Sequence, residues 1–440
     1  MKSLFFGGIH PKYKKEMSTG ITEIKNITPK QVVIPMVQHI GAPCTEILVQ
    51  VGDRVLMGQK IGDGEGMCVP VHASVSGTVV AIEPRPHTNG KMVTAVVIDN
   101  DFADETAEAT VCEDPLKTLS DDEILGKIRE AGLVGMGGAA FPSNIKAVSA
   151  MGKIDYLIAN ACECEPYITS DDTLLRTSPE QVLKGMQVLQ KVLNPEQTVL
   201  AIEDNKQAAI EVLRKLLPDY PGIELRVLPT RYPQGSEKQL IQAVCGRQVP
   251  SGKLPVNVGC TVFNVASFAA VYRAVYLGLS LTERIVTVTG EAVNQPQNFN
   301  VRIGTSFADV IEAAGGLKDN ADRVISGGPM MGTAQSDLSV PVVKATNAVL
   351  CLPGDGSLQV NDPVCLRCGK CAEVCPMGLQ PLYMYRYTLC GETDELERLH
   401  LTDCMECGCC SYVCPGKLPL VEQFRQGKAM LREIKAKEEE

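Results

Sequence analysis

Short apolar runs alternate with turn residues in the first quarter of the chain. From Val32 to Asp99 the runs EILVQVGDRV, GTVVAIE and MVTAVVID are rich in Val, Ile and Gly. Runs of this length and composition, separated by turns, are typical of β-strands in a small all-β unit. We therefore expect an all-β domain at residues 31–105, preceded by an N-terminal segment at residues 1–30.

The middle of the chain changes to a pattern in which apolar strands and amphipathic helices follow one another. The strand-like runs IDYLIANA, EQTVLAIE and GIELRVLPT are separated by helix-like stretches such as PEQVLKGMQVLQKVL and KQAAIEVLRKLL. This alternation predicts an α/β domain with a mainly parallel sheet at residues 115–281. The apolar window at 265–281 contains Arg273 and is too short to span a bilayer, so we predict a buried core helix there.

The last part of the chain has three further segments. We place a second domain with strand-like runs at residues 282–345, a cysteine-rich domain at 358–420 and a C-terminal helix at 421–440. Phe424, Leu431 and Ile434 lie roughly on one face of that helix, which we expect to pack on its own domain. Contact with a partner or a membrane surface is the alternative.

Length and charge narrow the possible functions. The chain has 440 residues, which is too long for one ordinary core. Its 42 basic and 52 acidic residues give a net charge of -10, which argues against nucleic acid as a partner and favours a charged small molecule or a protein. The first 20 residues contain too short an apolar run for a signal peptide, so we expect a cytosolic chain.

The cysteines carry the strongest chemical signal. Two stretches, CLRCGKCAEVCP at 365–376 and CMECGCCSYVCP at 404–415, share the spacing C-x2-C-x2-C-x3-C-P. Three thiolates at this spacing bind one 4Fe-4S cluster, and the fourth cysteine ligates the other cluster. The motifs therefore predict two clusters, one held by Cys365, Cys368, Cys371 and Cys414 and the other by Cys404, Cys407, Cys410 and Cys375.

Zinc is the competing interpretation of these motifs. Zinc sites usually join two C-x2-C pairs across a loop and have no use for a third cysteine in register, so we favour iron–sulfur clusters. Cys409 is left over, and we expect it to be a small buried thiol beside a cluster.

A glycine-rich stretch, AGLVGMGGAAFPSNIK at 131–146, is the candidate phosphate-binding loop. Gly135, Gly137 and Gly138 leave backbone N–H groups free to approach a phosphate, and Lys146 supplies the opposite charge. A tight structural loop is the ordinary alternative. The stretch does not match the dinucleotide fingerprint, because no strand directly precedes it and the glycine spacing differs.

This loop and YLIANACECEPYITSDD at 156–172 resemble the flavin-bearing, NADH-oxidising subunit of respiratory complex I. The stretches RYPQGSEKQL and TVFNVAS match two further patterns of that family. The resemblance implies that Gly135, Gly137, Gly138 and Lys146 cradle the phosphate of FMN and that Phe141 stacks near the nicotinamide. It also implies flavin or NADH contacts for Asn160, Glu163, Glu165, Tyr232, Gly235, Glu237 and Asn264. For the two strand-end carboxylates Glu163 and Glu165, simple exposure to solvent is the alternative.

The chain departs from the family pattern at six positions that bear on the shape of the pocket and on NADH binding. These positions are Ala140, Asn144, Cys162, Ser236, Phe263 and Ser267.

Two other segments have family resemblances. VGDRVLMGQKIG with VPVHASVSGTVVAIE resembles the two halves of a lipoyl or biotinyl barrel-sandwich domain. The hairpin between the halves, DGEGMC, has no carrier lysine, so we expect a structural or docking module. The segment at 283–317, continuing into VISGGPMMG, resembles the soluble-ligand-binding β-grasp (SLBB) module.

The order of these parts, with GGIHP near the N-terminus, resembles the C subunits of Rnf complexes, which are membrane-bound ferredoxin:NAD oxidoreductases. The resemblance implies an oxidoreductase subunit with FMN, two 4Fe-4S clusters and NAD(H), in which electrons move between NADH, FMN, clusters and partner. A flavin belongs in this path because nicotinamide moves two electrons as a hydride whereas a cluster accepts one at a time.

The same resemblance implies partners and a location. The partners would be other Rnf subunits, including a ferredoxin-like iron–sulfur subunit and integral membrane subunits that translocate ions. The chain would lie peripherally on the cytoplasmic side of a bacterial cell membrane. Two alternatives stay open, namely a soluble electron-transfer protein that feeds a cytosolic reductase and a non-enzymatic cluster relay.

Overall fold

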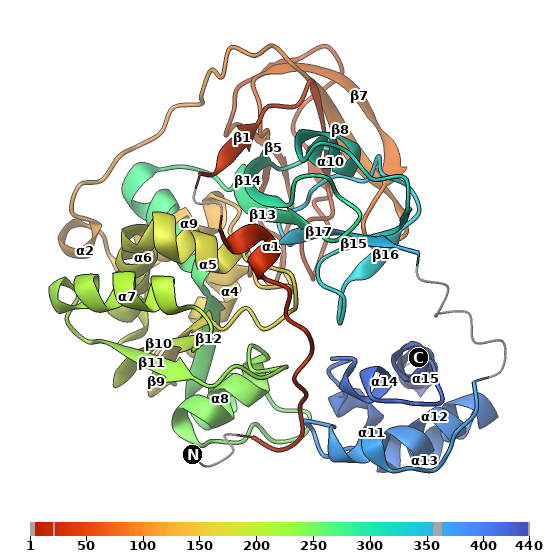
Figure 1. Ribbon diagram of the computed structural model, residues 1–440. Helices are drawn as coiled ribbons and strands as arrows, with labels where there is room; N and C mark the ends of the chain where they lie inside the picture. The colour runs from red at the N-terminus through yellow and green to blue at the C-terminus, as the bar shows by residue number, and fades with distance from the viewer. Residues whose placement is uncertain (1–4, 21–22, 355–362, 439–440) are drawn as a thin grey trace.

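The computed structural model describes residues 5–20, 23–354 and 363–438, so the boundary expected at residue 358 lies outside the described residues. Within these ranges the chain forms a β unit, an α/β unit, a mixed-sheet unit and a helical cysteine-rich unit (Figure 1). The predicted class, a multidomain chain of α/β and all-β parts, is confirmed.

The β unit is a sandwich of two small antiparallel sheets. The larger sheet has the order β2 (Gln31–Pro35), β8 (Met92–Asn100), β7 (Gly77–Pro86) and β4 (Arg54–Val55). The smaller sheet consists of β3 (Glu46–Ile47), β5 (Lys60–Asp63) and β6 (Val71–His72). Alternate residues such as Val32 and Ile34 point into a shared apolar core, as the period of two predicts.

The α/β unit is built on a fully parallel sheet. Its order is β11 (Ile223–Leu228), β10 (Gln197–Glu203), β9 (Tyr156–Ala161) and β12 (Cys260–Asn264). Its helices are α2 (Pro115–Thr118), α3 (Asp121–Glu130), α4 (Ser143–Ala150), α5 (Ser170–Thr177), α6 (Pro179–Leu193), α7 (Gln207–Leu216), α8 (Glu237–Cys245) and α9 (Val265–Leu277). The predicted parallel sheet and the buried helix at α9 are confirmed.

The mixed-sheet unit takes strands from distant parts of the chain. Its order is β1 (Lys25–Ile27), β14 (Gln297–Arg302), β13 (Glu283–Thr289), β17 (Ala348–Pro353), β15 (Ala321–Ser326) and β16 (Thr333–Gln335), with α10 (Phe307–Ala313) packed against it. Two features differ from expectation. Strand β1 comes from the N-terminal segment, and β17 lies beyond the boundary expected at residue 345.

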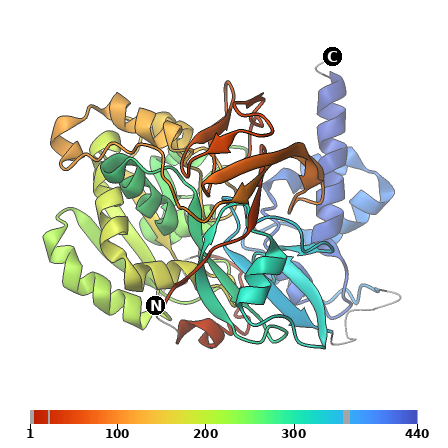
Figure 2. The ribbon, with the colours of Figure 1, turned by 90° about the horizontal axis from the view of Figure 1, so that it is seen from above.

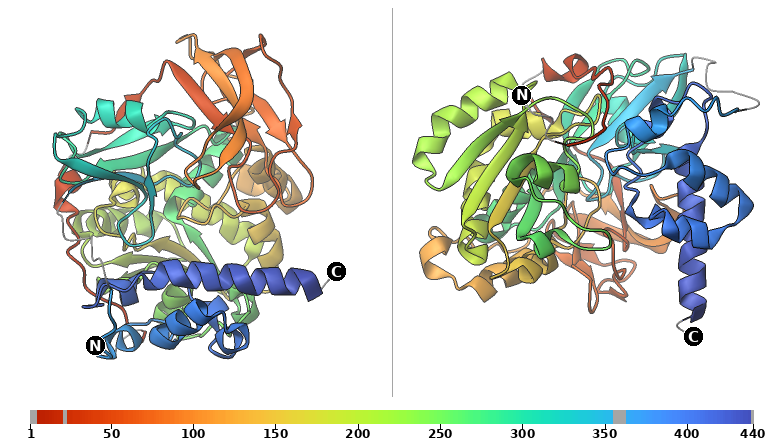
Figure 3. Two further views of the ribbon diagram at one scale, coloured as in Figure 1. Left: turned by 90° about the vertical axis from the view of Figure 1, so that its right-hand side faces the viewer. Right: turned by 90° about the horizontal axis from the view of Figure 1, so that it is seen from below.

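The cysteine-rich unit is helical. It contains α11 (Lys370–Glu373), α12 (Pro381–Cys390), α13 (Thr393–Arg398), α14 (Cys409–Tyr412) and the long α15 (Leu420–Glu438). From above, this unit lies on the opposite side of the molecule from α6 and α7 (Figure 2), and α15 extends as one straight helix (Figure 3). Phe424 and Leu431 are buried in its core, as predicted, whereas Ile434 is 38% exposed.

Among the helices of the described ranges, we find none that combines the length and the apolar character needed to cross a membrane.

Candidate functional site

The glycine-rich loop runs between α3 and α4 as a closed turn. The N–H of Gly135 donates to the carbonyl oxygen of Phe141 at 2.8 Å, and this bond brings the two ends of the loop together. Gly137 and Gly138 at its tip are exposed. Ala140, which replaces a family glycine, has a φ of +49°, in the left-handed region that favours glycine. The loop backbone therefore keeps a glycine-like course despite the substitution.

Residues of α9 and β13 donate or accept hydrogen bonds that hold the loop in place. Met136 donates its N–H to Ser267 Oγ at 2.9 Å and accepts from Arg284 Nη2 at 3.2 Å. Asn264 caps α9 by accepting the N–H of Ala266 at 2.8 Å. A Cβ on Gly137 would lie 3.1 Å from the Cβ of Asn264, so the loop passes close to the carboxyl end of β12. Ligands bind at this edge of open α/β sheets.

The start of α4 fits an anionic group. The helix follows Pro142 and has no side-chain cap. The buried atoms Ser143 Oγ and Asn144 Oδ1 have no hydrogen-bond partner within the described part of the chain. Lys146 places Nζ 2.6 Å from Glu237 Oε1 and 5.4 Å from the ring centroid of Phe263. The unpartnered Ser143 hydroxyl and the Lys146 ammonium, at a helix start beside a glycine loop, can donate to a phosphate, whereas Asn144 Oδ1 is an acceptor and cannot.

Two residues from separate motifs meet beside this loop. Asn160 near the end of β9 donates Nδ2 to the carbonyl oxygen of Gly235 at 2.8 Å and accepts the N–H of Cys162 at 3.1 Å. A Cβ on Gly235 would lie 3.1 Å from Cys164 Sγ, so a side chain there would crowd this contact. Asn160 and Gly235, which the resemblance assigns to flavin or NADH contacts, are therefore in direct contact in the fold.

Glu163 is engaged in a structural contact. Its carboxylate accepts the N–H of Asp171 at 2.6 Å, the N–H of Asp172 at 3.3 Å and the hydroxyl of Ser170 at 3.1 Å. An acidic group at a helix start binds free N–H groups and complements the helix dipole. Glu163 thus caps α5 from outside the helix, which differs from simple exposure to solvent.

Glu165 and Tyr232 face the other units rather than the glycine-rich loop. The Glu165 carboxylate accepts the N–H groups of Met330 at 3.2 Å and Met331 at 2.8 Å. Burial raises the pKa of this carboxyl to about 7. Tyr232 is fully buried, and its hydroxyl donates to the carbonyl oxygen of Cys407 at 2.7 Å.

Two residues in this region were missed by the sequence interpretation. Asp171 accepts from Asn264 Nδ2 at 2.6 Å, and burial raises the pKa of Asp171 to about 7. Lys15 is buried and donates Nζ to the carbonyl oxygens of Glu163, Glu165 and Ile168 at 2.8, 2.9 and 2.5 Å. The Ser-Asp-Asp run at 170–172 is a signal that could have identified Asp171. The local pattern around Lys15 contains no such signal.

Four cysteines of one predicted cluster line a single cavity. These residues are Cys375, Cys404, Cys407 and Cys410. Cys409, Glu406 and several apolar side chains, including Met384 and Phe424, also line the cavity. Cys375 Sγ accepts the N–H of Leu379 at 3.4 Å, a bond of the kind that tunes cluster potentials. This closed set of thiols with apolar walls fits a 4Fe-4S cluster.

The other four cysteines lie nearer the surface. Cys371 and Cys414 are close enough to interact electrostatically, and Cys365 Sγ accepts the N–H of Arg367 at 3.4 Å. Cys368 is exposed. Across the described ranges, no three His, Cys, Asp or Glu side chains converge on one point that would hold a single metal ion. Cluster ligands bind different irons of a cube, so they do not need to converge in this way.

Cys409 has the place expected for the remaining cysteine. Its side chain is fully buried beside Tyr232 and Cys407. A hydrogen bond from Cys409 lowers the pKa of Cys407, a predicted ligand. The predicted burial of Cys409 is confirmed. Its place beside a cluster stays a prediction.

Helix α8 connects the two candidate sites through its first turn. Glu237 pairs with Lys146 of the loop region. On the cysteine-rich side, Gln239 Nε2 donates to the carbonyl oxygen of Pro376 at 3.1 Å, and Lys238 lies 3.7 Å from Asp403. The candidate phosphate-binding residues around Lys146 and the cysteines of the inner cavity are therefore separated by the first turn of α8 and its side chains.

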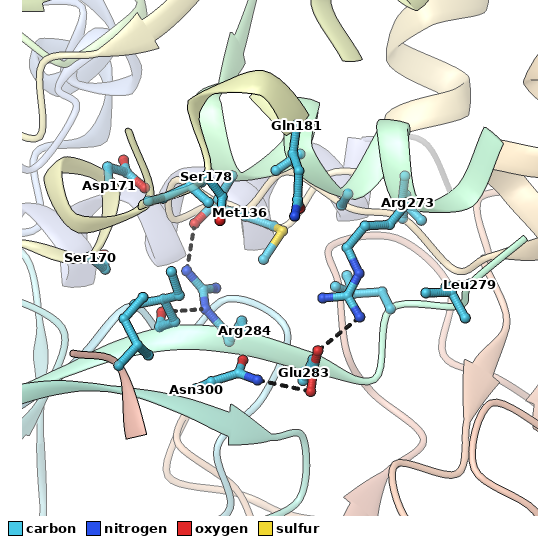
Figure 4. A pocket seen from close by; sticks show the side chains of 18 of the residues that line it. Met136, Ser170, Asp171, Ser178, Gln181, Arg273, Leu279, Glu283, Arg284 and Asn300 are labelled. Carbon is cyan, nitrogen blue, oxygen red and sulfur yellow. Dashed lines mark hydrogen bonds and ion pairs between the residues drawn. The ribbon is translucent and has the colours of Figure 1, made fainter. Parts of the chain in front are cut away.

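A further cavity of about 260 Å³ adjoins the loop between α5, α6, α9 and β13 (Figure 4). Arg273 and Glu283 form an ion pair at 2.8 Å in its wall. Met136 and Asp171 also line it, so the cavity touches residues that support the glycine-rich loop.

Family models match four successive parts of the chain. The RnfC barrel sandwich hybrid domain matches residues 3–103, and the Nuo51 FMN-binding domain matches residues 128–273. The SLBB domain matches residues 285–334, and the 4Fe-4S dicluster domain matches residues 357–415. Fold, site and matches together define a flavin- and iron–sulfur-containing oxidoreductase subunit, and the expected FMN and clusters are confirmed as its cofactors.

The chain belongs to the family of Rnf complex C subunits. It is 43% identical over 426 residues to the C subunit of the Na(+)-translocating ferredoxin:NAD(+) oxidoreductase complex of Acetobacterium woodii, with 96% of each chain covered. It is 44% identical to the C subunit of the proton-translocating complex of Clostridium ljungdahlii, over 87% of this chain and 83% of that one. For the C subunit of the ion-translocating oxidoreductase complex of Klebsiella pneumoniae, 43% identity covers 99% of this chain and 58% of that protein.

The fold also resembles a solved structure of NAD+-reducing [NiFe]-hydrogenase in the H2-reduced state. The TM-score is 0.50 at 22% sequence identity, over 73% of this chain and 65% of that chain. At this level of identity the likeness concerns the fold alone.

Proposed function

We propose that this chain is the subunit of a membrane-bound ferredoxin:NAD oxidoreductase complex that exchanges electrons with NADH. The names of the Acetobacterium woodii and Clostridium ljungdahlii relatives support the reaction of the complex. The observation that carries the proposal is the meeting of the glycine-rich loop and the cysteine cavity at α8. Glu237 contacts Lys146 on one side, and Gln239 contacts Pro376, next to Cys375, on the other.

The chain's own residues would hold and shield the cofactors. Lys146 and the start of α4 would bind the FMN phosphate, while Gly137 and Gly138 let the flavin approach the backbone. Asn160, Gly235 and Asn264 would line the flavin. When bound, FMN supplies the exchange between two-electron and one-electron steps.

The burial of the cysteines suggests the order of the clusters. The set of Cys375, Cys404, Cys407 and Cys410 faces the α/β unit and would exchange electrons with the flavin. The set of Cys365, Cys368, Cys371 and Cys414 lies farther out, next to Val364 and Leu366, which are 61% and 65% exposed. We therefore assign this outer cluster to the exchange with another protein of the complex.

The partners would be the other Rnf subunits, including a ferredoxin-like iron–sulfur subunit and integral membrane subunits. Ion translocation would take place in those subunits. We place this chain peripherally on the cytoplasmic side of the membrane, where NADH is available. A soluble protein that feeds a cytosolic reductase would have the same cofactors but would not bind to a membrane complex.

Anaerobic purification followed by titration with NADH tests the proposal. Flavin and iron are quantified on the same sample, and reduction is followed by visible and EPR spectroscopy. We expect one FMN, about eight irons and reduction of the clusters after NADH is added. Iron without flavin, or a flavin that NADH does not bleach, would overturn the proposal.

A further inference from the structure

The GGIHP stretch lies between the flavin and cluster sites. We call residues 5–15 the N-terminal seam. Ile9 and Tyr232 exchange two backbone hydrogen bonds at 2.8 and 3.0 Å, so the seam adds a short antiparallel bridge to the α/β unit. The N–H of Gly8 donates to the carbonyl oxygen of Val374 at 2.8 Å, on the cysteine-rich unit. One extended segment therefore binds both units through its backbone.

The seam contacts the turn that carries Cys375 directly and reaches the turn that carries Cys407 through Tyr232. Its contact with Val374 lies one residue before Cys375. Its partner Tyr232 donates a hydroxyl hydrogen bond to the carbonyl oxygen of Cys407 at 2.7 Å. Ile9, Tyr232 and Cys407 belong to one buried apolar cluster.

The two glycines of the seam leave no room for a side chain. A Cβ on Gly7 would lie 2.7 Å from the carbonyl carbon and oxygen of Cys375, and a Cβ on Gly8 would lie 2.7 Å from the carbonyl oxygen of Tyr232. The φ angles of Gly7 and Gly8 are +69° and +79°, a conformation that side chains also disfavour. Because glycine has no side chain, the backbones of the α/β unit and the cysteine-rich unit can pack against the seam more closely here than any other residue would allow.

The rest of the seam is held on the α/β unit. Arg231 donates Nη1 to the carbonyl oxygen of Phe5 at 3.2 Å and Nη2 to that of Gly7. At the other end, Lys15 holds the carbonyl oxygens of the loop at 163–168. The glycines therefore sit between two anchored ends.

We propose that Gly7 and Gly8 are positioning residues that set the distance between the flavin site and the inner cluster. The inference rests on the proposed function, because it requires both cofactors. Electron transfer between buried cofactors slows steeply as their separation grows.

The Gly8→Ala protein, purified with its cofactors, tests the proposal. The flavin is photoreduced with EDTA as the electron donor, so the result does not depend on NADH, and the rate of cluster reduction is followed by absorbance and freeze-quench EPR. We expect cluster reduction to be a few-fold slower than in the unaltered protein, with an unchanged rate of flavin reduction. A separate measurement tests the proposed function: in the unaltered protein, NADH should reduce the flavin, which is seen as a loss of flavin absorbance.

Gly152→Ala is the matched control, because Gly152 has a φ of +66° and nothing within 4 Å of an added Cβ. It carries the same backbone strain without the contact, and we expect normal cluster reduction. Arg231→Met provides a second variant that loosens the seam without inserting atoms, and it should also slow cluster reduction. Normal rates in both Gly8→Ala and Arg231→Met, with full flavin and iron, would overturn the proposal.

Discussion

Lys146 supplies a positive charge at the proposed flavin site. Replacing it with alanine removes the ammonium group beside the start of α4. We expect Lys146→Ala to weaken FMN binding about tenfold to a hundredfold, because hydrogen bonds to charged groups contribute about 1.5–3 kcal/mol. The measurement is the FMN dissociation constant from flavin fluorescence.

Lys153→Ala is the control for this prediction. Lys153 is exposed just after the same helix and donates to the carbonyl oxygen of Ser149 at 3.4 Å. FMN affinity should be unchanged in this variant. Equal affinity in both variants would contradict the role assigned to Lys146.

Glu165 predicts a specific pH dependence of stability. Its pKa of about 7 in the folded protein lies above the ordinary value of 4.5, because the carboxyl is buried. Between these two values the folded chain keeps a proton that the unfolded chain has released, so stability falls as the pH rises through this window. Glu165→Gln does not titrate and should lose less thermal stability than the unaltered protein between about pH 5 and pH 8.

The control for Glu165→Gln is a variant that removes an exposed carboxylate instead of a buried one. Glu211→Gln, on the exposed face of α7, serves this purpose. Thermal midpoints measured by circular dichroism should follow the unaltered protein for Glu211→Gln and diverge from it for Glu165→Gln. Parallel curves for all three proteins would show that Glu165 does not carry the proton.

At the level of residues, motifs predicted which groups come together but not which way they face. Asn160 contacts Gly235, and Lys146 contacts Glu237, although the two residues of each pair come from separate stretches. The partners of Glu165 are backbone N–H groups at residues 330–331, in another unit. A backbone N–H has no sequence signature, so the direction of this carboxylate could not be predicted.

Two elements of the α/β unit carry a pair of close thiols outside the cluster motifs. Cys245 ends α8, Cys260 begins β12, and their sulfur atoms lie 3.6 Å apart. Oxidised glutathione should convert this pair to a disulfide while two glutathione thiols are released. Alkylation of the native protein followed by peptide mass spectrometry measures the product.

The β unit offers an internal comparison for this reaction. Cys44 and Cys68 lie slightly closer, with sulfur atoms 3.4 Å apart, but both are buried. Cys245 is partly exposed. We expect the pair at Cys245 and Cys260 to oxidise first, because access limits exchange. Oxidation of both pairs at equal rates would contradict this explanation.

Elements with strong periodicity were predicted well, and edge strands were not. The stretch PEQVLKGMQVLQKVL forms α6 over its full length, because its apolar residues repeat at helical spacing. Strand β1 has three residues and pairs with β14 more than 270 positions away, Lys25 being opposite Phe299. A run this short carries no period, and its partner is chosen by tertiary contacts.

At the scale of the whole molecule, three units and the N-terminal seam converge on one region. The α/β unit supplies Tyr232, the mixed-sheet unit supplies Met330, and the cysteine-rich unit supplies Cys407, all within one apolar cluster. Sequence patterns predicted the separate units and their cofactors. The convergence depends on contacts between units, which no single motif encodes.

This convergence makes the order of the clusters the central claim. The inner cluster, at Cys375, Cys404, Cys407 and Cys410, should receive electrons from the flavin before the outer cluster does. Cys368→Ser removes a proposed ligand of the outer cluster, and Cys407→Ser removes a proposed ligand of the inner one. Each variant should lose up to about four irons and keep its flavin.

Freeze-quench EPR of the two variants after mixing with NADH tests this order most directly. In Cys368→Ser the remaining inner cluster should be reduced as fast as in the unaltered protein. In Cys407→Ser the flavin should bleach while the remaining outer cluster stays oxidised on the same timescale. Rapid reduction of the outer cluster in Cys407→Ser would contradict the proposed path.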